Sequence, residues 1–220
     1  MTKLFSKPRK ILAIAAHPDD LEYYIGGTLA RLSQSGSEII ATVCSNGEKG
    51  GAGNNLGEIR KREQELAGKI LGYKKVIFLE QPDQGLKANI HLNKKLVQLI
   101  EKVNPEVVFT FDCEKSLSFW EHSDHWAVGE ATLEAIRSLR DKISTKYLYL
   151  FCSRTPDVLI DISKTVGLKI KAFCAHRSQN HFPGILKISS WYILKMTKRY
   201  RLATNYEFVE SFRRIDLIYK

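Results

Sequence analysis

The sequence has few cysteines and no paired cysteine motif. Its four cysteines, Cys44, Cys113, Cys152 and Cys174, form no Cys-x-x-Cys pair. Buried, reduced thiols explain them better than disulfides do, which favours an intracellular compartment. No apolar run approaches the roughly 20 residues that a membrane span needs, and the run at residues 11–16 is too short for the core of a signal peptide. We therefore expect a cytoplasmic protein.

Acidic residues are absent from two segments, residues 1–18 and 187–201. The nine lysines and arginines in these segments account for almost all of the net charge of +10, so the rest of the chain is nearly neutral. This distribution argues against a basic nucleic-acid-binding face built into the domain.

The second of these segments lies within residues 185–202, which form an amphipathic helical pattern. A helical wheel places Ile193 and Met196 on an apolar face, and Trp191 among the cations on the other face. The simpler interpretation is a helix packed on the domain with its cations in water. The alternative is peripheral contact with an anionic membrane.

The alternation of short apolar runs with helical patterns predicts the fold class. The 220 residues, 44% hydrophobic and 26% charged, are enough for one domain with a core of its own. Continuous apolar strands between helices are typical of a parallel sheet covered on both faces. We expect a single α/β domain over residues 1–220 with one doubly wound, mostly parallel, Rossmann-like sheet. The predicted strands are residues 11–16, 38–44, 75–79, 107–111, 146–151 and 158–162, and the predicted helices are residues 21–35, 57–71, 91–103, 124–139 and 163–175.

Polar residues follow several of these strands, where ligands bind in such sheets. His17-Pro-Asp-Asp20 follows the first strand, and Asp112 and then His122-Ser-Asp-His125 follow the fourth. A dinucleotide site would have a Gly-x-Gly-x-x-Gly turn after the first strand. Two carboxylates at that position would repel a phosphate, so nucleotide binding without a metal is disfavoured.

The same residues suit a divalent metal. Imidazole and carboxylate groups are good zinc ligands, and a catalytic zinc keeps three protein ligands plus water. His17 and Asp20 lie three residues apart across a strand-to-helix turn, which leaves Asp19 to act as a base, and His125 is a candidate third ligand. Taken singly, Asp20 or Asp124 is more readily explained as a helix N-cap. The two clusters together favour a metal site.

Several motifs, in order along residues 9–212, give the chain a family resemblance. It resembles the PIG-L/LmbE family of metal-dependent N-deacetylases, whose members act on N-acetylglucosamine-containing substrates. The matching pieces are Ala16-His-Pro-Asp-Asp20 with Gly26-Gly27, Asn46-Gly-Glu48, Arg60-Lys-Arg-Glu63 with Leu71-Gly72, His122-Ser-Asp-His125, Ala175-His-Arg-Ser-Gln179 and a closing strand at residues 206–212. Ser123 stands where proline is common in the family.

The resemblance implies a zinc-dependent hydrolase that removes the N-acetyl group. It implies that His17, Asp20 and His125 bind the metal, which lowers the pKa of its water toward ~7. Asp19 would then be the general base that accepts the proton of this water. Fe²⁺ or another divalent ion also suits two histidines and an aspartate.

The resemblance also implies roles around the substrate. His122 would stabilise the oxyanion or donate a proton, and Asp124 would orient His122 and keep it charged. Arg60 and Asp83 are candidate substrate-binding residues, against the alternatives of a solvated helix arginine and a turn aspartate. His176 is expected to be structural.

Two other functions stay open at this stage. The same metal site would suit another amide or ester hydrolase, and the basic segments would suit a non-enzymatic module that binds anionic membrane or nucleic acid. The sequence identifies neither the group attached to the sugar nor the oligomeric state, so a homo-oligomer is also open.

Overall fold

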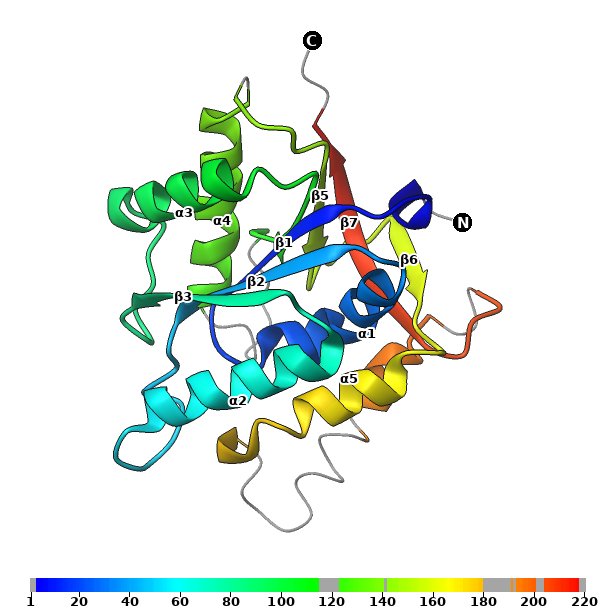
Figure 1. Cartoon of the computed structure of the whole chain (residues 1–220), viewed down its shortest axis with the longest axis horizontal. Helices are drawn as coiled ribbons and strands as arrows, with labels where there is room; N and C mark the ends of the chain where they lie inside the picture. Colours follow the sequence, from blue (N-terminus) through cyan, green and yellow to red (C-terminus); the bar gives the residue numbers. More distant parts are fainter. Residues whose placement is uncertain are drawn as a thin grey trace.

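One mixed β-sheet forms the centre of the molecule (Figure 1). The structure is a computed structural model that describes residues 3–114, 123–140, 142–179, 191, 193–200 and 204–217. Within these residues the sheet has seven strands in the order β3-β2-β1-β4-β5-β7-β6. The strands are β1 (Lys10–Ala15), β2 (Glu38–Ser45), β3 (Lys75–Gln81), β4 (Val107–Phe111), β5 (Tyr147–Phe151), β6 (Val158–Asp161) and β7 (Val209–Asp216).

The sheet is mostly parallel, as predicted. Strands β1 to β5 pair in parallel, whereas β7 runs antiparallel to both β5 and β6. The sequence predicts the closing strand at residues 206–212. In the structure this strand, β7, ends at Asp216, four residues later than predicted. Arg213 and Arg214 interrupt the apolar pattern after residue 212, so the sequence contains no sign that the strand continues. In the structure Arg213 pairs with Leu150 of β5, and its guanidinium bonds to Asp112.

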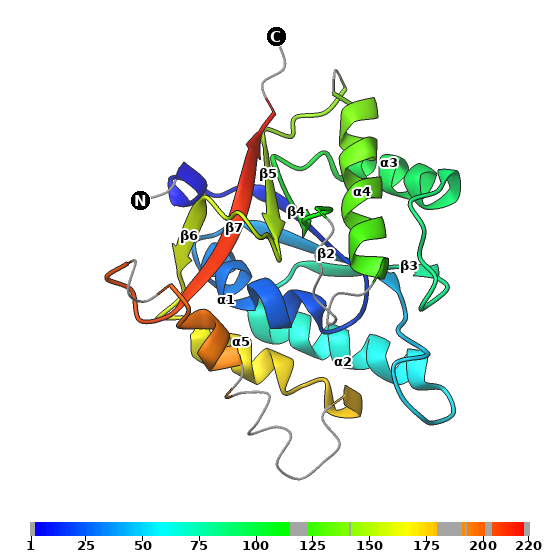
Figure 2. The same ribbon diagram turned by 180° about the vertical axis from the view of Figure 1, so that it is seen from behind.

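Helices cover both faces of the sheet (Figures 1 and 2). One face carries α3 (Ile90–Val103) and α4 (Ser123–Ser138), and the other carries α1 (Asp20–Gln34), α2 (Leu56–Leu71) and α5 (Val166–Phe173). Short 3-10 turns lie at Lys3–Phe5 (η1) and Arg177–Gln179 (η2). Because both faces are covered, residues Ile11, Leu12 and Ala13 of β1 are fully buried. This burial explains the continuous apolar run in the sequence.

Local sequence signals set the helix boundaries. The Asn89 side chain accepts hydrogen bonds from the amides of His91 and Leu92 and caps α3. Gly72 ends α2 with a φ of 77°, which glycine adopts without strain. The fifth helix is shorter than predicted, because the Ser163 amide and hydroxyl both bond to Asp161 and form a turn before α5. The other predicted helices agree with the structure to within one residue at either end.

A buried ion pair connects β7 to α5, and its carboxylate also contacts α1. The Glu210 carboxylate lies 2.5 Å from Lys169 Nζ of α5. It also accepts hydrogen bonds from the amides of Gly27, at 3.0 Å, and Thr28, at 2.7 Å. Lys169 is 1% exposed and Glu210 4% exposed. These contacts therefore hold β7, α5 and the middle of α1 together.

The basic amphipathic segment is described only at residue 191 and residues 193–200. Ile193 and Thr197 are buried, whereas Lys195, Lys198 and Arg199 are exposed, in agreement with a helix packed on the domain. Met196, placed on the apolar face by the helical wheel, is 42% exposed. The expected position of Met196 on the buried face is therefore wrong.

No helix in the described residues combines the length and apolar character needed to cross a membrane. Contact of the basic segment with a membrane surface stays a prediction.

We predict that Gly129→Ala lowers the free energy of unfolding by about 1–3 kcal/mol. An added Cβ at Gly129 would lie 2.6 Å from the Phe111 carbonyl oxygen, and β4 backbone cannot move away freely. Urea unfolding followed by circular dichroism measures the change. Gly167→Ala in α5 is the matched control, because nothing lies within 4 Å of its Cβ position. Alanine there should raise stability by up to about 1 kcal/mol. Equal effects of the two substitutions would contradict the packing argument.

Candidate active site

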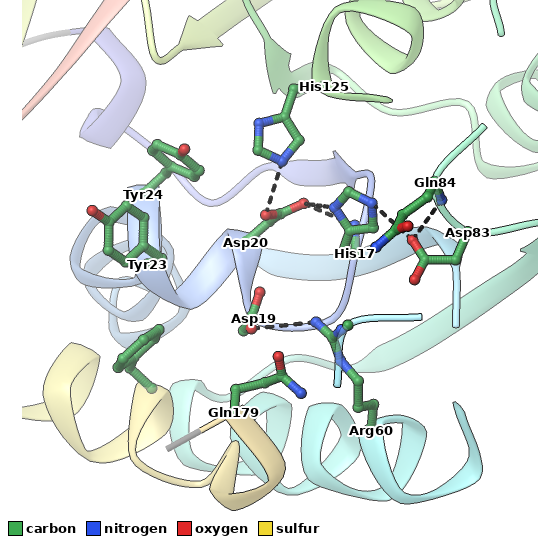
Figure 3. A pocket seen from close by; sticks show the side chains of 12 residues that line it. His17, Asp19, Asp20, Tyr23, Tyr24, Arg60, Asp83, Gln84, His125 and Gln179 are labelled. Atoms are coloured by element: carbon green, nitrogen blue, oxygen red, sulfur yellow. Dashed lines mark hydrogen bonds and ion pairs between the residues drawn. The ribbon is translucent and has the colours of Figure 1, made fainter. Parts of the chain in front are cut away.

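Residues after β1 and β3 and at the start of α4 meet at the carboxyl edge of the sheet, as expected for parallel strands. They line a cavity of about 730 Å³. Figure 3 shows the Asp20 carboxylate between His125 and His17, with Asp19 and Arg60 together below them. The turn after β1 and the start of α4 are about 100 residues apart in the sequence, so the fold itself brings the two clusters together.

The turn between β1 and α1 is held by Asp20. Its Oδ2 accepts hydrogen bonds from the amides of Ala16, at 3.1 Å, and His17, at 2.8 Å. Its Oδ1 lies 3.3 Å from His125 Nε2. Burial raises the pKa of Asp20, but the charges and hydrogen bonds of His125 and His17 outweigh burial and lower it. Asp20 is therefore a buried carboxylate that stays ionised.

Carboxylates surround the His17 ring on both sides. Nδ1 lies 3.6 Å from Asp20 Oδ2, and Nε2 lies 3.2 Å from both Asp83 Oδ1 and Asp124 Oδ2. Burial lowers the pKa of His17, but the hydrogen bonds to Asp124, Asp20 and Asp83 raise it to about 12. The site thus gathers more negative charge than its histidines alone would balance.

Aromatic rings fix the position of His125. Its ring stacks on Phe111 with centroids 4.0 Å apart and an interplanar angle of 9°. Tyr24 meets the same ring edge-on at 6.0 Å. His125 is 5% exposed, so packing leaves its ring little freedom to move away from Asp20.

Asp19 has an unusual backbone conformation for a residue other than glycine. Its φ is 94° and its ψ is −22° at the N-terminus of α1, a left-handed conformation that typically costs about 1–3 kcal/mol. Its carboxylate lies 3.3 Å from Arg60 Nη2. Burial raises the pKa of Asp19 to about 6, although the charges of Arg60 and His176 oppose the rise. Such a pKa suits a general base near neutral pH.

Arg60 and Asp83, the predicted substrate-binding residues, both line the cavity. The Arg60 guanidinium is also engaged with backbone, since it donates to the Pro18 carbonyl at 2.6 Å and the Gly47 carbonyl at 2.9 Å. Asp83 is 2% exposed and accepts from the Lys49 amide at 2.8 Å. Both side chains therefore help to shape the wall, and their contact with a substrate stays a prediction.

Asp124 faces His17 through Oδ2 and accepts a hydrogen bond from the Leu86 amide, at 3.2 Å, through Oδ1. Its predicted partner His122 lies outside the described residues. The structure thus gives Asp124 a contact that the sequence did not indicate, while its predicted effect on His122 stays untested.

Two groups of side chains in the described part of the chain have the donors and spacing for a metal ion. They are His17 with Asp20 and His125, and His17 with Asp83 and Asp124, and the ligand atoms of each group lie within 4.8 Å of one another. The first group offers two imidazoles and a carboxylate, a donor set typical of zinc. All three of its residues line the cavity, whereas Asp124 does not. The first group therefore fits a metal that must also reach a substrate.

Three polar residues near the site were not named as site residues from the sequence, although Gln179 belongs to the late motif. Gln179 lines the cavity, while Gln64 and Glu22 are fully buried beside it. Gln64 Oε1 accepts a hydrogen bond from the Asp19 amide at 3.0 Å. The four-residue spacing of Arg60 and Gln64 places both on one face of α2 and was an available signal.

The late motif at residues 175–179 packs against the site through buried carboxylates. His176 Nε2 lies 3.2 Å from Glu22 Oε2, and both side chains are 0% exposed. The Ser178 amide and hydroxyl both donate to Glu63 of α2. These contacts agree with the expected structural role of His176, and they place Gln179 at the cavity wall.

Comparison with known proteins identifies the family. Residues 12–136 match the family described as PIG-L, GlcNAc-PI de-N-acetylase, and this stretch includes the three candidate metal ligands. The chain belongs to the PIG-L family. It is thus an N-deacetylase, a hydrolase, as the motifs indicated.

Relatives of this PIG-L chain share most of its length. Diacetylchitobiose deacetylase of Thermococcus kodakarensis is 26% identical over 98% of this chain and 86% of its own. A probable N-acetyl-α-D-glucosaminyl L-malate deacetylase 2 of Bacillus anthracis is 29% identical over 78% of this chain and 81% of its own. The structure of N,N'-diacetylchitobiose deacetylase from Pyrococcus horikoshii, in complex with the inhibitor MPG, superposes with a TM-score of 0.89 at 27% identity. It covers 98% of this chain and 87% of that one.

We predict that His125→Ala abolishes tight zinc binding. Its effect on zinc affinity should exceed the roughly 10–100-fold that loss of an outer-sphere partner causes, because an inner ligand is lost. Isothermal titration of the metal-free protein with Zn²⁺ measures the affinity. His91→Ala is the control, because His91 is exposed on α3 and should leave zinc affinity unchanged. Equal affinities in the two variants would remove His125 from the ligand set.

Proposed function

We propose that this protein removes the acetyl group from an N-acetylglucosamine-containing substrate, with Zn²⁺ held by His17, Asp20 and His125. The observation that carries the proposal is the meeting of these three side chains at the cavity wall, with Asp19 beside them. The relatives support the substrate class, since their names describe deacetylases of N-acetylglucosamine-containing compounds.

Several side chains have separate roles in the reaction. When bound, the metal polarises the acetyl carbonyl and lowers the pKa of a water molecule. Asp19 accepts the proton of this water and is held in place through Arg60. Asp83 and Asp124 accept from the Nε2–H of His17, which fixes the ring orientation and directs Nδ1 toward Asp20.

The later steps need a group on the other side of the carbonyl. We assign His122 to stabilise the oxyanion or donate a proton, as the family motif implies, and Asp124 to support it. The amine then leaves with a proton from Asp19 or His122. Arg60 and Asp83 border the space that the sugar would occupy.

Asp19→Asn should retain zinc and lower the turnover number by about 10²–10⁴-fold. Asparagine tolerates the left-handed conformation of Asp19 and removes only the basic group. Amine release from N-acetylglucosaminides, with zinc content measured on the same samples, tests this expectation. Turnover close to that of the wild type would refute the base assignment.

Removal of the metal by a chelator should abolish deacetylation, and added Zn²⁺ should restore it. The reason is that the donor set of two histidines and a carboxylate suits zinc. Parallel reconstitution with Fe²⁺ under anaerobic conditions compares the two ions. Recovery with Fe²⁺ alone would overturn the zinc assignment. A wild-type enzyme that hydrolyses simple esters and no N-acetylated sugar would overturn the substrate class.

A further inference from the structure

The conformation of Asp19 needs a support that the turn itself does not supply. Its φ of 94° is left-handed, and its side chain makes no cap hydrogen bond to the start of α1. The Asp19 amide instead points out of the turn and donates to Gln64 Oε1 of α2, at 3.0 Å. A contact from another helix therefore fixes the backbone that carries the proposed base.

The orientation of the Gln64 amide group is determined by Glu22. Gln64 Nε2 donates to Glu22 Oε1 at 3.0 Å, and Gln64 is 0% exposed. The Asp19 amide can only donate a hydrogen bond, so the oxygen of Gln64 must face it. The nitrogen of Gln64 then faces Glu22 Oε1. This pairing removes the usual ambiguity of a glutamine side chain.

Glu22 is itself held at both oxygens. Oε1 also accepts from the Tyr73 hydroxyl at 3.1 Å, and Oε2 lies 3.2 Å from His176 Nε2. Glu22 and His176 are both fully buried. The chain of contacts thus runs from the late motif through α1 and α2 to the turn that carries Asp19.

We propose that Gln64 is a positioning residue for Asp19, and that the buried Glu22–His176 pair fixes Gln64 in the orientation it needs. The catalytic consequence rests on the proposed function, because Asp19 must be the base for its position to affect the rate. Among the described residues, Gln64 hydrogen bonds to Asp19 and Glu22 and to neither His17 nor His125, so zinc binding should not depend on it.

Gln64→Met tests the contact directly, because methionine fills similar space and offers no strong acceptor to the Asp19 amide. We expect kcat per zinc-loaded enzyme to fall about 10–100-fold, with KM changed less than about twofold and zinc stoichiometry unchanged. Amide exchange at Asp19, followed by NMR of the ¹⁵N-labelled protein, should accelerate at least about tenfold. Thr132→Val, another fully buried position, lies on α4 away from the cavity. It should change neither kcat nor the exchange at Asp19.

A double variant that exchanges the acid and the amide between positions 22 and 64 tests whether kcat can be restored. Gln64→Glu alone sets two carboxylates against each other and should lower kcat. Adding Glu22→Gln places a donor at position 22 opposite the new carboxylate and keeps an acceptor for the Asp19 amide at position 64. The double variant should regain kcat to within about threefold of the wild type, a coupling that a double-mutant cycle detects. It also keeps the test valid if Gln64→Met fails to fold.

The outcomes separate this proposal from the proposed function. If Gln64→Met keeps its kcat, or if its Asp19 amide exchanges as in the wild type, the positioning role is wrong. Failure of the double variant to recover turnover above the Gln64→Glu level would overturn the role of Glu22. If the wild type deacetylates no N-acetylglucosaminide while exchange at Asp19 still accelerates in Gln64→Met, the proposed function fails and the positioning contact is supported.

Discussion

The Asp20 carboxylate is the interaction on which the site depends. One oxygen accepts from two amides of the turn after β1, and the other faces His125, 105 residues later in the chain. The Asp20 side chain thus both closes the turn and contacts a second candidate ligand, His125. Its burial makes this arrangement rigid, because a buried carboxylate that loses its donors is strongly destabilised. The start of α1 and the geometry of the site are therefore set together.

The loops after β2 and β3 belong to the site through their backbone. The Lys49 amide donates to Asp83, and the Leu86 amide donates to Asp124. Both carboxylates face Nε2 of His17, whereas Asp20 faces Nδ1. Loop amides thus hold two acids that would otherwise repel each other, and both acids contact the Nε2 atom of His17. Changes in either loop would act on the histidine without touching it.

Residues whose side-chain type and position at a strand end both point to a metal could be predicted from the sequence. Residues that reach the site only through the packing of helices could not. His17, Asp20 and His125 follow from ligand types at the ends of parallel strands. Gln64 and Glu22 resemble ordinary polar helix residues, and their importance appears only once α1, α2 and the late motif pack together. The limits of β7 were missed for the same reason, because the pairing of Arg213 with Asp112 keeps a charged residue within the sheet.

The position of β7 has a consequence for the order in which the molecule can be completed. This strand inserts between β5 and β6, although it follows both in the chain. Until it is in place, Lys169 lacks the carboxylate of Glu210, and the amides of Gly27 and Thr28 lack their acceptor. During synthesis on the ribosome, the helix that begins at Asp20 therefore lacks its contact with Glu210 until residue 210 has emerged.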